Sequence, residues 1–313
     1  MKTPRIVLQS SLAVLLAAPF GCSDSNTPEG PPAGQMGELK VGDRPESVTR
    51  GFGGRLYVSV QNAAGDGDDG EIKMVDGDKV TTFVGGLKEP KGIALVGNYL
   101  VVTDVTRVWK VDSAGVKSVL AEGAAFPSPV VFLNDAATEP GGQAVLITEM
   151  GQVSKAFDPM TMGLWPTTSM EATQIMAEAR VYRITVPAGQ VTIAVDKSRD
   201  MLLVNGVTAP SAGRLLLAEF FFGNILEVNG TTMKTLATGY RGADGIELDD
   251  QGNIYLSSYS QGKVWKLDSA GKNEKVILDM RGFGSTADHY LDQANKRLII
   301  PDTGKGTIIF QPI

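Results

Sequence analysis

The stretch that decides the fold is ADGIELDDQGNIYLSSYSQGKVWKLDSAGKNEKVIL, residues 243–278. It holds four short segments of alternating apolar residues, and Gly, Asn, Asp and Ser separate them. Alternation with a period of two predicts strands with one buried face, and the SAG turn predicts an antiparallel hairpin. The stretch therefore predicts one sheet of four antiparallel strands.

The same pattern recurs along the chain. Its second strand reads RLYVSV, YLVVTD, AVLITE, LLLAEF, IYLSSY and LIIPDT in six successive copies. The copies repeat about every 44 residues where no insertion intervenes, which is the period of a four-stranded propeller blade. We therefore expect an all-β chain that folds as a single six-bladed β-propeller over residues 37–313.

The ends of the chain predict how the propeller closes. The sixth copy stops at Ile313 after three strands, and the strand-like segment GELKV, residues 37–41, lies directly before the first copy. Pairing this segment with the last blade would supply its fourth strand and remove two exposed edges. We expect the N-terminal strand to close the ring of blades.

The third copy carries an insertion between Met150 and Val181. Thr168 and Glu171 have the spacing of a capping box, which predicts a short helix. An apolar face of that helix would consist of Ala172, Ile175, Met176 and Ala179. Because the loop between the second and third strands lies at the end where the first strand begins, we expect the insertion to stand over that mouth of the central channel.

The first 22 residues have the features of a signal peptide. Lys2 and Arg5 precede an apolar run over residues 6–20 that is too short to span a bilayer comfortably. Cys22 follows this run and resembles the lipidated cysteine of bacterial lipoproteins; ordinary secretion with an incidental cysteine is the alternative. Residues 23–36 are polar and rich in Pro and Gly, which predicts a flexible linker. We expect an exported protein, a periplasmic or cell-surface lipoprotein anchored to a bacterial membrane through Cys22.

The composition excludes some classes of function. The chain has 313 residues with 29 Lys and Arg, 35 Asp and Glu, and a net charge of -6. The absence of a basic cluster argues against a nucleic-acid partner, and a single cysteine permits no intramolecular disulfide. We expect a monomer that binds a small molecule.

One polar position precedes every second strand by nine to eleven residues. A residue that recurs at the start of each first strand points toward the axis, so these six residues are expected to form a ring at one mouth of the channel. Carboxylate and amide oxygens with no cysteine favour a hard divalent cation, calcium before magnesium. Alternatively, the lysine ammonium pairs with a ring carboxylate and the site is free of metal. The predicted ring residues are Glu46, Lys91, Asn134, Asn205, Asp244 and Asp288.

Four of these residues carry a family resemblance. Glu46 in PES, Asn134 in LND, Asn205 in an NG pair and Asp244 in a DG pair occur in blades one, three, four and five. With them the chain resembles the senescence-marker protein/gluconolactonase (regucalcin-like) family of six-bladed propellers. The resemblance implies that these four residues hold a divalent cation, that Asp244 acts as the base, and that the activity is calcium-dependent hydrolysis of a lactone or ester. Phe132 stands where the family commonly places a substrate-binding Arg, which disfavours a phosphorylated or strongly polar sugar lactone.

Other residues allow two interpretations each. His289, the single histidine, is either a second candidate base or a histidine buried between blades. Phe221 and Trp165, with several methionines, either line an apolar substrate pocket under a lid or pack the insertion. Four strand ends are acidic and are either a second layer around the site or solvent-facing. They are Asp104, Glu149, Glu219 and Asp302.

The fold alone does not choose between functions. The alternative to a hydrolase is a non-catalytic propeller lipoprotein that binds a small ligand or a protein partner. A lyase on a strictosidine-synthase-like scaffold is a further possibility.

Overall fold

The structure is a computed structural model, and it describes residues 29–63, 67–280 and 285–313. The predicted signal peptide of residues 1–22, the predicted lipid attachment at Cys22 and linker residues 23–28 lie outside these ranges. Within the described residues, no helix has the length and apolar character needed to cross a bilayer.

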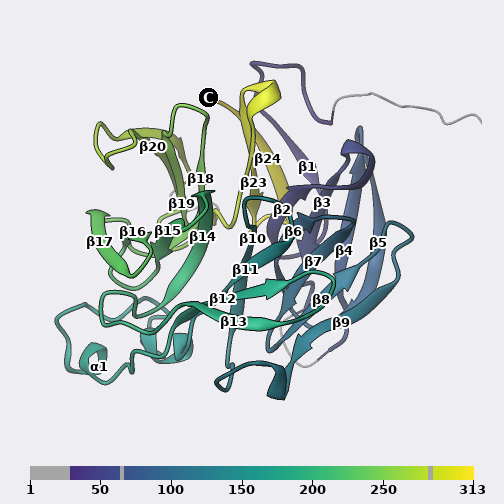
Figure 1. Cartoon of the computed structure of the whole chain (residues 1–313). Coiled ribbons are helices and arrows are strands. Elements are labelled where there is room, and N and C mark those ends of the chain that lie inside the picture. The colour runs from purple at the N-terminus through teal and green to yellow at the C-terminus, as the bar shows by residue number, and fades with distance from the viewer. Residues whose placement is uncertain (1–28, 64–66, 281–284) are drawn as a thin grey trace, which may run out of the picture.

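Six four-stranded antiparallel sheets are arranged around a centre, as the sequence predicts (Figure 1). The first three blades are β2–β5 (Pro45–Arg50, Leu56–Val60, Gly70–Asp76, Lys79–Leu87), β6–β9 (Pro90–Val96, Tyr99–Asp104, Arg107–Val111, Lys117–Glu122) and β10–β13 (Leu133–Thr138, Ala144–Glu149, Arg180–Thr185, Val191–Val195). Blades four and five are β14–β17 (Val204–Ser211, Arg214–Glu219, Asn224–Asn229, Thr232–Ala237) and β18–β21 (Ala243–Leu248, Ile254–Ser258, Lys263–Leu267, Lys275–Asp279). The last blade combines β22–β24 (Tyr290–Asp292, Arg297–Asp302, Thr307–Pro312) with β1 (Gly37–Lys40).

The first strand of each blade lies innermost. It contacts the first strands of both neighbouring blades, and β22 contacts β18 on one side and β2 on the other. Six of the seven buried apolar clusters among the described residues each join two neighbouring blades, as where Phe310 of blade six packs with Val58 of blade one. The core therefore lies between blades, and it fixes the first strands around a central channel.

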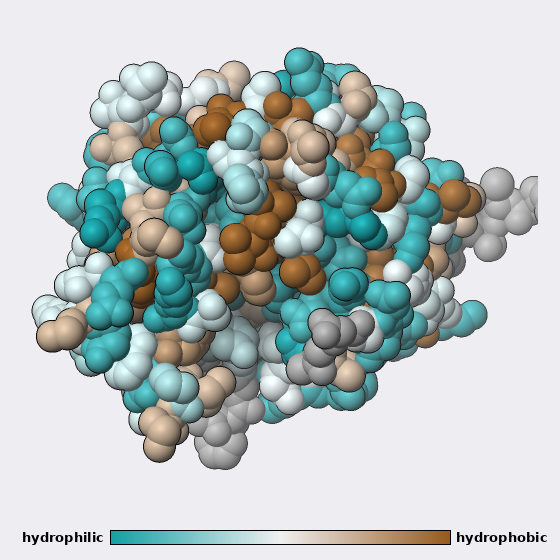
Figure 2. Space-filling view, turned by 90° about the horizontal axis from the view of Figure 1, so that it is seen from below, coloured by the Kyte–Doolittle hydropathy of each residue, from teal (hydrophilic) through white to brown (hydrophobic). Residues whose placement is uncertain are grey.

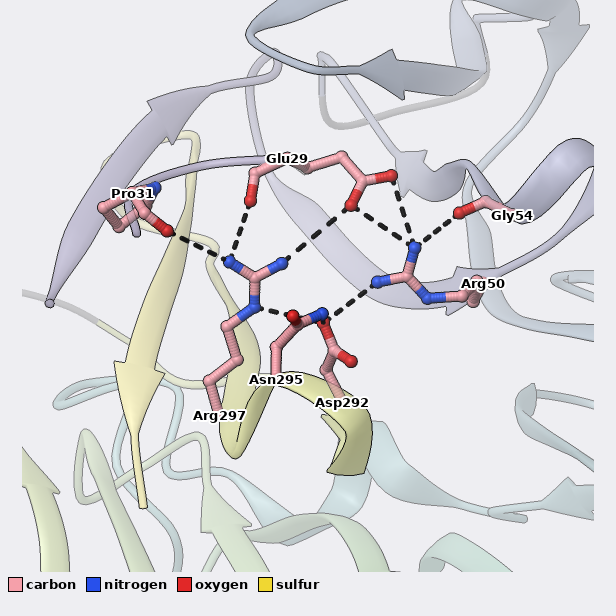
Figure 3. Close-up of polar contacts among 7 residues, drawn as sticks. All are labelled: Glu29, Pro31, Arg50, Gly54, Asp292, Asn295 and Arg297. Carbon is pink, nitrogen blue, oxygen red and sulfur yellow. Dashed lines mark hydrogen bonds and ion pairs between the residues drawn. The ribbon is translucent and has the colours of Figure 1, made fainter. Parts of the chain in front are cut away.

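The predicted closure is confirmed. β1 pairs with β24 in antiparallel register, with Gly37 opposite Phe310 and Lys40 opposite Thr307. The chain before β1 is also held: the Glu29 carboxylate is buried and lies between Arg50 of blade one and Arg297 of blade six (Figure 3). Glu29 belongs to the segment expected to be a flexible linker, so the contact with the propeller begins earlier than the sequence indicated.

The insertion in blade three holds less helix than expected. It contains a 3-10 turn, η3 (Val153–Ala156), and one short helix, α1 (Met170–Thr173), at the lower left of Figure 1. The helix cap is Ser169, whose Oγ accepts a hydrogen bond from the Ala172 amide, so the prediction of Thr168 as the cap was wrong by one residue. Because α1 ends at Thr173, no continuous helical face forms. The remaining 3-10 turns are η1 (Phe52–Gly54), η2 (Gly123–Ala125) and η4 (Gln293–Asn295).

Candidate functional site

Five of the six predicted ring residues line one cavity of about 240 Å³, here called the ring pocket. They come from the first strands of blades one to five, and each side chain is at most 7% exposed. They are Glu46, Lys91, Asn134, Asn205 and Asp244. The sequence period thus brings five polar side chains from five blades into one enclosure.

A bulge turns each of these side chains toward the channel. Between the first and second strands of each of the first five blades the register shifts, as between Pro45 and Val48 in blade one and between Ala243 and Ile246 in blade five. The ring residue is the first of the two unpaired residues in each bulge. Bulges commonly re-aim a side chain beside a site, and this one recurs at the same place in every repeat.

In blades four and five a glycine follows the ring residue, which gives the NG and DG pairs of the sequence. A Cβ on Gly206 would lie 2.1 Å from the carbonyl oxygen of Asp244 in the next blade, and a Cβ on Gly245 would lie 2.5 Å from Asp288 Oδ1. Glycine is therefore needed where the backbone of the following blade approaches closely.

Hydroxyl groups on the second strands hold the bulges together. Ser59 Oγ accepts from the amide of Ser47 over 3.0 Å, and Ser257 Oγ accepts from the amide of Gly245 over 2.9 Å. The Ser59 and Thr103 hydroxyls also donate to the carbonyls of Lys91 and Asn134, the ring residues of the next blades. We did not anticipate these hydroxyls, although Ser or Thr recurs near the end of four of the second strands.

The oxygen donors of the ring pocket are held in fixed orientations. Gln61 donates to Glu46 Oε2 over 2.9 Å. The Asn134 amide nitrogen contacts the sulfur of Met150 at 2.9 Å, which leaves its carbonyl oxygen available to a ligand. Asp244 Oδ1 is buried and has no hydrogen-bond partner among the described residues.

The surroundings of Asp244 in the ring pocket shift its pKa. Burial raises the pKa of Asp244 well above its ordinary value, and the carboxylates of Glu46 and Asp135 raise it further. The charge of Lys91 and a hydrogen bond with Asn205 lower the pKa of Asp244. A bound cation would favour the ionised form, since an opposite charge nearby stabilises a carboxylate.

Lys91 lies in this pocket without a carboxylate partner. Its ammonium is 4.9 Å from the centroid of the Phe132 ring. Among the described residues it forms no ion pair, not even with Glu46 or Asp244, which line the same pocket. The predicted pairing of Lys91 with Glu46 or Asp288 is therefore wrong in this arrangement, and the charge is instead stabilised by an aromatic face.

Asp288, the sixth predicted ring residue, does not line the ring pocket. It lines a second cavity of about 210 Å³ further along the first strands, here called the acidic cavity, which Asp135 and Glu247 also line. The backbone of Thr286 pairs with that of Asp302 in an antiparallel β-bridge. Ser257 Oγ donates a hydrogen bond to the carbonyl of Ala287, just as Ser59 Oγ donates one to the carbonyl of the ring residue Lys91. Ala287 therefore holds the ring position of blade six.

The prediction of Asp288 as a ring residue was wrong because the ring position of blade six lies one residue earlier in the chain. Moving the register by one residue along a strand turns each side chain to the other face. Asp288 occupies the second position of the bulge, where blade three has Asp135, and its Oδ2 accepts from Ser47 Oγ over 2.5 Å. Burial raises the pKa of Asp288 well above its ordinary value, and Asp135 raises it further.

His289 is also absent from the ring pocket. It is 1% exposed and lines the acidic cavity. Burial lowers its pKa to about 3, so the ring is neutral, and neither nitrogen has a hydrogen-bond partner among the described residues. The structure separates His289 from the ring pocket, which fits the interpretation of a buried histidine and not that of a base for a substrate bound there.

Apolar side chains form one wall of the ring pocket. They come from blades three and four and from the insertion, and they are Phe132, Met150, Val153, Phe157 and Phe220. Phe221 and Trp165 do not line the pocket but belong to the apolar cluster of the insertion, which fits the second of their two interpretations. Seen from the side on which α1 lies in Figure 1, hydrophobic residues gather near the middle of the surface and hydrophilic residues surround them (Figure 2).

Most of the clustered methionines do not line the pocket. Met160, Met162, Met170 and Met176 are 50 to 89% exposed. Met150 alone among the five lines the ring pocket. Of the apolar residues singled out in the sequence, Phe132 and Met150 thus belong to the wall of the pocket, whereas the other four methionines do not. Other pocket residues that the sequence reasoning missed are Arg44, Gln61, Ser154, Tyr259 and Thr303.

The acidic strand ends hold the loops that carry the ring residues. The Asp104 carboxylate accepts from the amides of Lys88 and Glu89, and Glu149 accepts from Val131 and Phe132. Glu219 accepts from the amides of Leu203, Phe221 and Phe222, and Asp302 from those of Ser285, Gly304 and Lys305. All four carboxylates are at most 5% exposed, so the solvent-facing interpretation was wrong. They fix the backbone two or three residues before each ring position.

Comparisons with known proteins were made on the whole chain. No protein-family model matches the sequence, and no curated protein matches it significantly. Among solved structures, the chain is similar to a gluconolactonase from Xanthomonas campestris, with a TM-score of 0.64 and 18% sequence identity over 90% of both chains. At this identity the likeness shows the fold that the two proteins share.

Proposed function

We propose that this protein is a calcium-dependent hydrolase of a lactone or ester. The observation that carries the proposal is the convergence of four oxygen donors from four blades on the ring pocket, namely Glu46, Asn134, Asn205 and Asp244. The four residues match the ligand pattern of the family that the sequence resembles. The gluconolactonase with a similar fold supports the lactone class.

The donor set suits a divalent cation that prefers oxygen. Asp244 Oδ1 is buried without a partner among the described residues, and a cation would satisfy it. In the described ranges no group of three His, Cys, Asp or Glu side chains is placed to hold a metal ion, so the two amide oxygens would have to serve as ligands. Calcium takes about six to eight oxygens, and water and substrate would supply the rest.

Several residues of the ring pocket have a defined part in the proposed reaction. When bound, the cation would polarise the carbonyl of the substrate and stabilise negative charge on its oxygen. Asp244 is the proposed base that takes a proton from the attacking water, as the family resemblance implies, and a bound cation would keep its carboxylate in the ionised form that a base requires. Gln61 holds the Glu46 carboxylate in place. The apolar wall around Phe132 and Phe220 limits the entry of bulk water.

The second candidate is a non-catalytic propeller that binds a small ligand or a protein partner. The unpaired Lys91 ammonium favours this candidate, because it would repel a cation that binds in the same pocket. Export to the cell envelope and attachment through Cys22 belong to both candidates and rest on the sequence of residues 1–22. An electrophoretic comparison of the wild type with Cys22→Ser, after labelling with a radioactive fatty acid, tests the attachment.

The direct test of the hydrolase is calcium binding by the purified mature protein. A ligand present at about 100 times its Kd stabilises the folded state by about 2.7 kcal/mol, and we expect calcium to raise the melting temperature accordingly. Asp244→Asn should abolish that shift, whereas the matched control Asp250→Asn, an exposed residue of the same blade, should retain it. Turnover is then measured on a panel of lactones and esters. Absence of a calcium shift in the wild type would remove the basis of the proposal.

A further inference from the structure

Lys91 is a buried cation that forms no ion pair among the described residues. It is 6% exposed, lies on the first strand of blade two, and lines the ring pocket between the blades that carry Glu46 and Asn134. Removing an ammonium from water is costly unless a partner compensates it. The ammonium lies 4.9 Å from the centroid of the Phe132 ring, and among the described residues it acts on the Asp244 carboxylate only through the charge interaction that lowers the pKa of that group.

The charges of the loaded pocket leave Lys91 uncompensated. The carboxylates of Glu46 and Asp244 balance the two charges of the proposed calcium ion. Arg44, the other cation that lines the pocket, has Glu89 at 4.0 Å and donates to Gln61 over 2.5 Å. One positive charge therefore remains, and it belongs to Lys91.

The wall beside this charge is apolar. Phe132, Met150 and Phe220 line the same pocket as the lysine, and such surfaces bind the hydrocarbon part of a ligand. A cavity of about 240 Å³ admits a small molecule. The combination of one free cation and an apolar wall suits a compact molecule that carries a single anionic group.

We propose that Lys91 recognises a carboxylate on the substrate, and that the substrate class is a carboxylate-bearing lactone or ester with an otherwise apolar body. This inference rests on the proposed hydrolase function for the reaction, but the recognition of the carboxylate does not require turnover. In the complex the ammonium donates a charge-assisted hydrogen bond to the carboxylate while the Phe132 ring covers its other side.

The kinetic test compares two lactones that differ at one substituent. The γ-lactone of α-hydroxyglutarate carries a carboxylate where γ-valerolactone carries a methyl group. We expect the wild type to favour the carboxylated lactone in kcat/KM by about 10- to 100-fold, the value of a hydrogen bond between charged groups. Lys91→Met should remove this preference and Lys91→Arg should restore it. The matched control Lys88→Met, three residues earlier and exposed, should retain it.

A binding measurement separates this inference from the proposed function. Calorimetry with hexanoate and with hexanol, in the presence of calcium, measures carboxylate recognition in the absence of any reaction. If neither lactone is hydrolysed but hexanoate binds to the wild type and not to Lys91→Met, the hydrolase fails and the carboxylate site stands. If γ-valerolactone is hydrolysed and Lys91→Met keeps the wild-type preference between the lactones, the hydrolase stands and the carboxylate site is overturned. Melting temperatures of all variants confirm that each is folded.

Discussion

The side-chain amide of Gln61 donates a hydrogen bond to Glu46 Oε2 over 2.9 Å, and so joins the end of the second strand of blade one to the ring residue of the same blade. The other side of the Gln61 amide accepts from Arg44. Gln61 is 1% exposed, so its side chain has little freedom to move. The orientation of the Glu46 carboxylate is therefore set by Gln61, whose own side chain is held by Arg44.

Replacing Gln61 should weaken calcium binding. Gln61→Leu keeps the volume of the side chain but removes its hydrogen bond to Glu46, and loss of such an outer partner typically costs about 10- to 100-fold in metal affinity. Calorimetric titration with calcium checks this expectation. Gln251→Leu, an exposed residue at the far end of blade five, is the control and should bind as the wild type does. Equal affinities for the wild type and Gln61→Leu would show that Glu46 needs no such support.

Gly206 should tolerate no side chain. A Cβ at this position would lie 2.1 Å from the Asp244 carbonyl oxygen, so Gly206→Ala must displace the first strand of blade five. We expect the free energy of unfolding to fall by at least about 2 kcal/mol, together with a loss of calcium affinity. Chemical denaturation measures the first effect and calorimetry the second. Gly85→Ala, where an added Cβ meets nothing within 4 Å, should change stability by less than about 0.5 kcal/mol.

The number of blades could be predicted from the sequence because the pattern of strands and turns recurs in each of the six copies. The sequence also predicted the closure by β1, since a blade with three strands needs a fourth. It was sufficient for five of the ring residues because a bulge nine to eleven residues before the second strand presents them all to the channel.

The sequence failed at Asp288 for a physical reason. In blade six Thr286 pairs with Asp302, so Ala287 holds the ring position, eleven residues before Leu298 as Asn134 is before Val145, and Asp288 lines the acidic cavity. Spacing alone does not reveal such a slip, because an acidic residue fits the expected chemistry better than alanine. The prediction of the helix in the insertion was also inaccurate. The α1 helix is only four residues long, and the apolar residues after it pack against Phe220 and Phe221 without forming a helical face.

Glu219 should make stability depend on pH. Burial raises its pKa from 4.5 to about 7 against the opposing effect of its backbone amide donors. The folded state thus holds a proton that the unfolded chain releases as the pH rises above 4.5, so this contribution to stability is present at low pH and is lost as the pH rises to about 7. The loss amounts to about 3 kcal/mol at most.

The measurement is the difference between variants, since other buried carboxyls titrate in the same range. The free energy of unfolding is determined by chemical denaturation at about pH 5 and about pH 8. Glu219→Gln should show a smaller decline between the two pH values than the wild type. Glu227→Gln should decline as the wild type does, because Arg214 and Lys234 lower the pKa of Glu227 out of this range. A decline in Glu219→Gln that equals that of the wild type would contradict the assignment.

Glu29 should stabilise the closure of the propeller more than an exposed ion pair does. Its carboxylate lies 3.3 Å from Arg50 and 3.9 Å from Arg297, and its backbone carbonyl accepts from Arg297 over 2.8 Å (Figure 3). Because the Arg297 side chain is 3% exposed, Glu29→Gln leaves it with Asp292, at 3.0 Å, as its one carboxylate partner among the described residues, and should lower the free energy of unfolding by about 2 kcal/mol. Glu38→Gln removes a pair with Lys305 in which both side chains are at least 40% exposed, and should cost at most about 1 kcal/mol. Chemical denaturation of the two variants side by side checks the contrast, and equal losses would mean that β1 alone, without the segment before it, holds blades one and six together.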